Sequence, residues 1–257
     1  MSIQNRFKSY VICTAPRSGS TLLCKMLQQT GRAGFPDSHF HRPDLESWMK
    51  TYKLPKDNYA SNHEMLAATF AAARARGTGD TGMFGLRLQR GSFDFFRQKT
   101  AELFSAYDRD SDRIEAAFGK TLFIHLTRPN KIDQAISRVK AEQSGLWHKA
   151  ADGSEIERTT PPQELHYDRV EIERHVLELT KFDEDWKAWF DEQSIKPHKI
   201  SYDNLAGHPR EILAQLLDEL GLDRAIAKDI TPPTAKLADE VSIAWAARYR
   251  NEIPDKH

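Results

Sequence analysis

Apolar residues along the chain gather in four short runs that are rich in β-branched and aromatic side chains. Such runs are typical of buried strands. The predicted strands are Tyr10–Thr14, Met83–Gln89, Thr121–Thr127 and His198–Tyr202. Each run leads into a segment with the apolar spacing of a helix. Strands that alternate with helices predict a three-layer α/β fold, in which a mostly parallel central sheet is flanked by helices and ligands bind at the carboxyl ends of the strands.

Three helices are indicated by periodic apolar positions or by composition. Pro209 can open the first and Gly221 can cap it, with apolar residues at helical spacing between them, at Ile212, Leu213, Leu216, Leu217 and Leu220. The second belongs to a helical insert of about residues 149–196, and its apolar stripe, typical of core packing, comprises Val176, Leu179, Phe182, Trp186, Trp189 and Phe190. The third is the alanine-rich segment Glu64–Arg76. The polar segment Lys149–Gln163 is expected to be an exposed loop or lid.

Length and composition exclude several classes of protein but do not identify the function. The 257 residues suit one domain, 1–257, and the 37 basic residues balance 37 acidic ones, so no overall field attracts nucleic acid or an anionic membrane. No apolar stretch has the roughly 20 residues of a membrane span, and no signal peptide precedes the first strand. We therefore expect a cytoplasmic protein with no nucleic-acid partner. Cys13 and Cys24 are too few for a disulfide framework, and His39 and His41 lack a partner at zinc spacing, so no metal site is expected.

The turn after the first strand has the features of an anion site. Its sequence is "APRSGST", residues 15–21. A helix that begins near Ser20 would point its unpaired N–H groups into the turn, where Gly19 allows close backbone approach and Arg17 supplies a fixed positive fork. Ser18 and Thr21 add hydroxyl groups. A plain N-cap would explain Ser20 alone, but not the arginine, the glycine and the other hydroxyls.

This turn is P-loop-like but lacks the Walker A lysine and first glycine, which disfavours a magnesium nucleotide. A second cationic element follows the third strand, where Arg128 precedes Pro129 and Ser137 lies about two helical turns further on. A phosphate that bridges Arg128 and Ser137 would lie alongside that helix. The two elements together predict two phosphate subsites for one ligand.

At these residues the sequence resembles the sulfotransferases that use 3′-phosphoadenylyl sulfate (PAPS). "YVICTAPRSGSTLL" is similar to their 5′-phosphosulfate loop, and "HLTRPNKIDQAIS" to their 3′-phosphate element. The tail "KLADEVSIAWAARYR" resembles that of the Stf0 branch. The resemblance, which runs from about Tyr10 to Arg250, implies the sulfotransferase fold and direct transfer of a sulfuryl group to a carbohydrate or glycoconjugate hydroxyl, such as a lipopolysaccharide-type glycan or a small sugar. It also implies a homodimer.

The resemblance carries roles to individual positions. It assigns the phosphosulfate to Arg17, Ser18, Gly19, Ser20 and Thr21, and the 3′-phosphate to Arg128 and Ser137. Lys236 and Arg248 would lie in a C-terminal segment, about residues 229–250, that closes over the nucleotide. In "GLRLQ", Arg87 would contact the acceptor or the sulfuryl group.

One position departs from the family pattern, which affects the choice of general base. Where the branch has a glutamate that acts as the proposed base, "GFPDSHF" has Ser38. Asp37 and His39 flank it and are the candidate bases, with Asp37 favoured because it is ionised at neutral pH. The alternative role for Asp37 is to cap a short helix within "SHFHRPDLESW".

Acceptor contacts are expected from aromatic residues in the connecting segments. Trp147 and His148 are the preferred pair, and the others considered are Trp48, Tyr52 and Tyr59. Two alternative functions stay open. A kinase or phosphatase would want a Walker lysine or a cysteine within the turn, and Cys13 precedes it. A nucleotide-binding relative without transfer activity would explain the missing glutamate.

Overall fold

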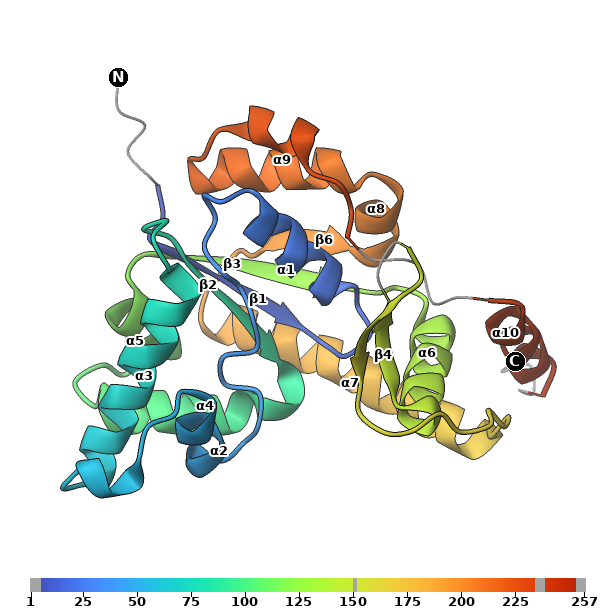
Figure 1. Ribbon diagram of the computed structural model, residues 1–257, viewed down its shortest axis with the longest axis horizontal. Helices are drawn as coiled ribbons and strands as arrows, with labels where there is room; N and C mark the ends of the chain where they lie inside the picture. The colour runs from blue at the N-terminus through green and yellow to red at the C-terminus, as the bar shows by residue number, and fades with distance from the viewer. Residues whose placement is uncertain (1–5, 150–151, 234–238, 253–257) are drawn as a thin grey trace.

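The computed structural model describes residues 6–149, 152–233 and 239–252. Its centre is a parallel sheet of four strands, β1 (Ser9–Thr14), β2 (Phe84–Gln89), β3 (Thr121–Thr127) and β6 (His198–Ser201), in the order β2-β1-β3-β6 (Figure 1). All neighbouring strands pair in parallel. The four predicted strands and the parallel sheet are therefore confirmed.

Ten α-helices connect or flank the strands in the described residues. They are α1 (Ser20–Gln29), α2 (Leu45–Thr51), α3 (Asn62–Thr78), α4 (Arg90–Leu103), α5 (Asp110–Phe118), α6 (Lys131–Ser144), α7 (Arg169–Glu192), α8 (Tyr202–Gly207), α9 (Pro209–Leu220) and α10 (Glu240–Glu252). Two short 3₁₀ helices, η1 (Lys56–Asn58) and η2 (Arg224–Asp229), complete the set. The predicted helices at 64–76 and 209–220 are confirmed, the latter with proline at its start and Gly221 in the left-handed region at its end.

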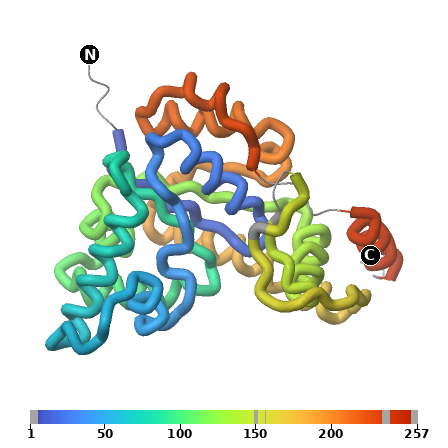
Figure 2. The backbone as a smooth tube through the Cα atoms, in the orientation of Figure 1, coloured from blue at the N-terminus to red at the C-terminus, as the bar shows by residue number. Residues whose placement is uncertain are grey.

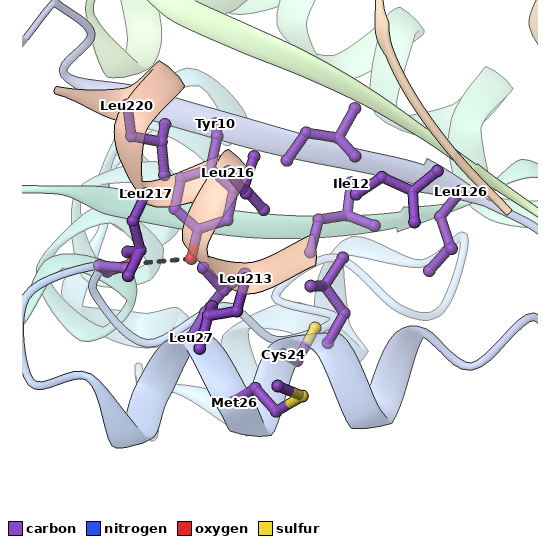
Figure 3. Close-up of a cluster of buried hydrophobic side chains, with 14 of the residues drawn as sticks. Tyr10, Ile12, Cys24, Met26, Leu27, Leu126, Leu213, Leu216, Leu217 and Leu220 are labelled. Atoms are coloured by element: carbon purple, nitrogen blue, oxygen red, sulfur yellow. Dashed lines mark hydrogen bonds between the residues drawn. The ribbon is translucent and has the colours of Figure 1, made fainter. Parts of the chain in front are cut away.

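One face of the sheet is covered by α1, α8 and α9. Tyr10 and Ile12 of β1 point to this side, because successive strand residues alternate between faces. They pack with Leu27 of α1 and with the leucines of α9, Leu213, Leu216, Leu217 and Leu220 (Figure 3). The hydroxyl of Tyr10 donates to the carbonyl oxygen of Ala33 at 2.7 Å, so the one polar atom of that ring is satisfied inside the core.

The opposite face carries an aromatic core. Val11 and Cys13 of β1 point to it, and α3, α4, α5 and α7 cover it. Its rings include Phe40, Phe70, Phe84, Phe93, Phe96, Phe118, Trp186, Trp189 and Phe190. The tryptophans come from the stripe predicted on residues 176–190, so the expectation that this stripe packs into the core is confirmed. Cys13 and Cys24 are both free and buried.

A third cluster joins α6, α7 and α10 beyond the end of the sheet, and a two-stranded antiparallel hairpin lies beside α6 (Figure 2). The hairpin consists of β4 (Leu146–Lys149) and β5 (Glu155–Arg158). The polar segment 149–163, expected to be a loop, thus contains a strand, because its residues pair with β4. Helix α7 occupies residues 169–192 of the predicted insert.

Trp186 fixes α7 to the carboxyl end of β1. Its indole N–H donates to the carbonyl oxygen of Thr14 at 2.9 Å, and both residues are fully buried. We expect Trp186→Phe to lower the free energy of unfolding by about 1–3 kcal/mol, because it leaves that carbonyl without a donor. Urea unfolding measures the change. On the same helix, Leu177→Ala removes an exposed side chain and is expected to stay within about 0.5 kcal/mol. Equal losses in both variants would contradict this account.

Candidate functional site

A cavity of about 650 Å³ opens at the carboxyl ends of the strands. Its lining includes the β1–α1 turn, the end of β2, the β3–α6 connection with α6, and the β4–β5 hairpin, together with residues of the 38–43 segment, α7, α8 and α10. This is the edge at which open α/β sheets bind their ligands. Arg17, Arg128 and Ser137, which the sequence singled out for phosphate groups, therefore come together here from positions more than a hundred residues apart.

The β1–α1 turn has the predicted shape. Helix α1 begins at Ser20, and Gly19 precedes it in the left-handed region, with φ at 85°. A Cβ atom on Gly19 would lie 2.6 Å from a ring carbon of Tyr202, so a larger residue is excluded by both conformation and space. The N–H groups of the first turn of α1 have no acceptor within the helix. Gly19, Ser20 and Thr21 line the cavity.

Ser18 has a different role from the other hydroxyl residues of the turn. It is fully buried, and its Oγ lies 2.5 Å from Oγ1 of Thr14, which in turn donates to the carbonyl oxygen of Leu126. Ser18 is not among the cavity-lining residues. Its side chain therefore ties the turn to β1 and β3.

Arg17 and Arg128 lie side by side at the cavity wall. A guanidinium N–H of Arg128 is 3.4 Å from the carbonyl oxygen of Arg17, and neither side chain forms an ion pair with a carboxylate in the part of the chain described. Burial and the charge of Arg128 lower the pKa of Arg17 to about 10, and burial lowers that of Arg128. Both remain cationic at neutral pH. The carboxylates that act on them, Glu157 for Arg17 and Asp133 and Asp203 for Arg128, do so without forming an ion pair in the described residues.

Neutral contacts hold these two arginines in place. Arg17 donates to Ser137 Oγ at 3.0 Å and to the carbonyl oxygen of Trp147 at 2.5 Å. Arg128 lies over the ring of Tyr202, 4.4 Å from its centroid, and its Nε is buried with no hydrogen-bond partner. A buried donor without a partner is costly unless a ligand supplies an acceptor.

Ser137 lies at the cavity, but its hydroxyl contacts Arg17 and not Arg128. The sequence paired it with Arg128, and the structure places its hydroxyl against the Arg17 side chain, with all three residues lining one cavity. The two expected phosphate elements are thus contiguous.

Arg87, at the end of β2, projects into the same cavity. Its guanidinium donates to Ser38 Oγ at 2.8 Å and to Thr21 Oγ1 at 2.9 Å, and it forms an ion pair with Asp37 at 3.4 Å. Arg87 therefore connects the anion turn to the segment that carries Ser38.

The two residues expected as bases do not line this cavity. Asp37 is exposed; its backbone pairs beside β2, and its carboxylate accepts from Arg87 and from the N–H of Ser38. His39 is buried under Phe84, where its Nε2 lies 3.1 Å from the Phe35 carbonyl oxygen and its Nδ1 lies 3.2 Å from the Tyr52 hydroxyl.

Burial lowers the pKa of His39, an effect that Asp37 partly opposes. The alternative role for Asp37 is wrong, since Asp44 caps the helix that follows.

Of the aromatic candidates, Trp147 and His148 line the cavity. The ring of Trp147 lies 5.9 Å from the Arg17 guanidinium, and His148 Nε2 is 3.0 Å from Thr21 Oγ1. Trp48 is instead buried among Phe40, Phe70 and Phe95. Tyr52 and Tyr59 are not cavity-lining residues.

Of the two C-terminal candidates, the structure describes only Arg248, which does not line the cavity. Arg248 lies on an exposed part of α10, over the ring of Tyr167 and paired with Glu252. Lys236 lies outside the described residues. Helix α10 reaches the cavity through Ser242, whose hydroxyl accepts from Lys140 at 2.8 Å.

Sequence reasoning missed several lining residues, among them His41, Glu157, Arg138, Glu178 and Tyr202. Tyr202 was detectable in principle, because it is the last residue of a predicted strand, His198–Tyr202, and ligands bind at the carboxyl ends of such strands. Glu157 was not, because the hairpin that places it was expected to be a loop. Within the described residues no cluster of three or more histidine, cysteine or acidic side chains is arranged to hold a metal ion, and no helix is long and apolar enough to cross a bilayer.

Comparisons with known proteins identify the family. A family model described as Stf0 sulphotransferase matches residues 9–252. Trehalose 2-sulfotransferase from Mycobacterium tuberculosis is 28% identical over 267 residues, 96% of each chain, and the enzyme of the same name from Mycolicibacterium smegmatis is 26% identical over 265 residues, 95% of each. A crystal structure of a sulfotransferase from Alicyclobacillus acidocaldarius aligns with 93% of this chain and 91% of its own, with a TM-score of 0.43 and 15% identity.

The matched residues include the β1–α1 turn, Arg87, the β3–α6 connection and the hairpin. Because the family model covers nearly the whole chain, the protein belongs to the Stf0 sulphotransferase family and is a sulfotransferase enzyme.

Proposed function

We propose that this enzyme takes its sulfuryl group from PAPS and transfers it to a carbohydrate hydroxyl. The observation that carries the proposal is the pair Arg17 and Arg128, which lines the cavity without a carboxylate partner among the described residues. Two adjacent cations that form no ion pair favour a ligand with several negative charges. PAPS carries a phosphosulfate at one end of its nucleoside and a 3′-phosphate nearby.

The phosphosulfate is assigned to the β1–α1 turn. First-turn N–H groups of α1, together with Gly19, Ser20 and Thr21, offer donors that a helix N-terminus directs toward an anion. Arg17 lies on the same turn and supplies the charge. Ser18 supports the turn from below through its contact with Thr14.

The 3′-phosphate is assigned to Arg128 and Ser137. The unpartnered Nε of Arg128 is a ready donor, and Tyr202 holds that guanidinium flat against its ring. Ser137 gives up its contact with Arg17 when a phosphate takes its place. The absence of a Walker lysine in the turn disfavours the alternative of a magnesium nucleotide.

The chemistry is in-line displacement at sulfur. The acceptor oxygen attacks, the bond between sulfur and the phosphate oxygen breaks, and negative charge develops on the leaving 5′-phosphate. Donors that are already fixed in the turn stabilise this charge without reorganisation. Arg87, at hydrogen-bond distance from Thr21, lies where it can contact the transferred group or the acceptor.

The acceptor is assigned to the class of carbohydrates, with trehalose and lipopolysaccharide-type glycans as candidates. The two mycobacterial relatives are named for trehalose. In this chain Trp147 offers an aromatic face at the cavity, next to the polar side chain of His148. Such pairing of an apolar ring with nearby polar groups suits a sugar.

Arg17→Ala is expected to lower kcat by about a hundredfold to a thousandfold at saturating PAPS, because one preorganised cationic donor to the leaving phosphate is lost. Steady-state transfer assays measure the change. Arg32→Ala, at an exposed position, is the matched control and is expected to keep the wild-type rate. Near-full turnover in Arg17→Ala would count strongly against the assignment.

Arg128→Ala is expected to weaken binding of 3′-phosphoadenosine 5′-phosphate about tenfold or more, since a charged hydrogen bond contributes about 1.5–3 kcal/mol. Binding of AMP, which lacks only the 3′-phosphate, is expected to change little. Calorimetry with both ligands tests this. An equal loss for both ligands would place Arg128 elsewhere on the nucleotide. Tight binding of magnesium-ATP, with none of the 3′-phosphorylated nucleotide, would favour a kinase.

Incubation with PAPS and a panel of trehalose, lipopolysaccharide and a polysaccharide extract is expected to yield a product heavier by one sulfuryl group. Mass spectrometry identifies the acceptor. A protein that binds the nucleotide tightly but sulfates no panel member would instead support the nucleotide-binding relative without transfer activity.

A further inference from the structure

Transfer to a hydroxyl releases a proton, and a group at the cavity must receive it. The carboxylates of the described lining residues are Glu157 and Glu178. Glu178 is already paired with two arginines, Arg138 at 2.9 Å and Arg174 at 3.6 Å. The cavity also exposes two histidines, His41 and His148, neither of which was considered as a base from the sequence.

His148 is the one of these that contacts the anion turn. Its Nε2 lies 3.0 Å from Thr21 Oγ1. That oxygen already accepts from the Arg87 guanidinium at 2.9 Å, and an arginine can only donate. The Thr21 hydroxyl oxygen has a second lone pair and one proton, so it can pair with either tautomer of the His148 ring. In the tautomer with the ring proton on Nδ1, the Thr21 hydroxyl donates to Nε2, and the lone pair of that nitrogen faces the place assigned to the sulfuryl group.

Glu157 lies beside the same nitrogen. Its Oε2 is 3.5 Å from His148 Nε2, and it comes from the opposite strand of the hairpin. A carboxylate at this distance compensates the charge of an imidazolium ring. His148 and Glu157 thus form a pair in which one group can take a proton and the other can stabilise the result.

We propose that His148 is the general base of the transfer and that Glu157 stabilises its protonated form. This inference rests on the proposed function. In the step, a lone pair of the acceptor oxygen forms the new bond to sulfur, and the electrons of the old S–O bond leave with the 5′-phosphate. The acceptor hydroxyl replaces the Thr21 hydroxyl as the hydrogen-bond donor to Nε2 of His148, and its proton moves to that nitrogen. The new N–H faces Glu157, and the proton is later released to solvent.

The charges around His148 make this base responsive to the donor. Burial and the cations Arg17, Arg87 and Lys25 lower the pKa of His148 to about 3, while Glu157 is the facing anion. The ring is consequently neutral at neutral pH. A bound phosphosulfate offsets the charges of Arg17 and Arg87, and so raises the pKa toward the ordinary value for histidine. The base becomes stronger when the donor is in place.

His41 is the nearest rival. It also lines the cavity, but it has no hydrogen bond to the anion turn in the described structure. Asp37 is the rival from sequence, and its carboxylate faces Arg87 outside the lining. The experiment therefore includes variants of His41 and Asp37 as the alternative candidates for the base.

The test measures kcat, KM for PAPS and their pH dependence for the full chain with the panel member that the wild type sulfates. His148→Ala and His148→Gln are both expected to lose about a hundredfold or more in kcat, with KM for PAPS changed little. Glutamine keeps a hydrogen bond but cannot take a proton, so rescue by His148→Gln would reduce His148 to a positioning residue and overturn the proposal. Added imidazole is expected to restore part of the rate of His148→Ala.

The wild-type rate is expected to fall at acidic pH as the base becomes protonated, and this limb is expected to vanish in both His148 variants. Glu157→Gln is expected to lower kcat less than His148→Ala does and to shift the acidic limb toward lower pH, because the loss of the facing anion lowers the pKa of His148. His166→Gln and Glu164→Gln, at exposed positions outside the cavity, are matched controls that keep the wild-type rate.

A second readout needs no acceptor. Titration by NMR is expected to show the His148 ring neutral at about pH 5 in the free protein, below the ordinary pKa of about 6.5, with an upward shift in pKa on binding 3′-phosphoadenosine 5′-phosphate. If the pKa of His148 does not change when the nucleotide binds, the proposed position of His148 beside the phosphosulfate is wrong.

The remaining outcomes separate the two proposals. A wild-type enzyme that sulfates no panel member overturns the proposed function and this role with it. If the wild type is active and His148→Ala keeps kcat within threefold of it, the role of His148 as base is wrong and the proposed function stands. The same conclusion follows if only Asp37→Asn or only His41→Ala lowers kcat.

Discussion

The site depends on holding two arginines next to each other without a counter-ion in the described chain. Like charges at this separation repel, and both side chains are partly removed from water, which adds a desolvation cost. The protein offsets this with neutral groups: a carbonyl oxygen from the hairpin, a serine hydroxyl from α6 and the ring of Tyr202. Neutral partners fix the geometry and leave the positive charge for a ligand.

The sheet makes this arrangement possible because its central strands end at the same edge. β1 lies between β2 and β3, so the residues that follow those three strands emerge as neighbours. The buried hydrogen bonds of Thr14 and Ser18 fix the turn after β1, and the indole of Trp186 holds α7 against the same point. Both cores therefore converge on the turn that carries the charge, and the positions of Arg17 and Arg128 follow from the packing beneath them.

Periodicity and composition in the sequence were enough to predict the four strands, the helices at 64–76 and 209–220 and the stripe on α7, and residue types were enough to predict the helix that begins at Ser20 after Gly19, because each depends on local spacing or local backbone chemistry. They could not predict contacts between residues that are far apart in the sequence and meet only in the fold. Ser137 contacts Arg17 because α6 is placed by α7 and α10, and nothing near Ser137 in the sequence records this. His39 was close to the right segment, but the strand-like pairing of Asp37 beside β2 turns its ring into the core. The hairpin was missed because its strands have only four residues each and β5 is mostly charged.

The hairpin belongs to the cavity without belonging to the core. Its described side chains are absent from all three hydrophobic clusters, and it is joined to the anion turn by the hydrogen bond from Arg17 to the Trp147 carbonyl oxygen. That bond uses backbone on the hairpin side, so it is indifferent to which side chains the hairpin displays. Apart from His148 and Glu157, substitutions there can therefore accumulate with little cost to folding. The side of the cavity built by the sheet is fixed by the architecture, while the side built by the hairpin can change its remaining side chains without disturbing the cores.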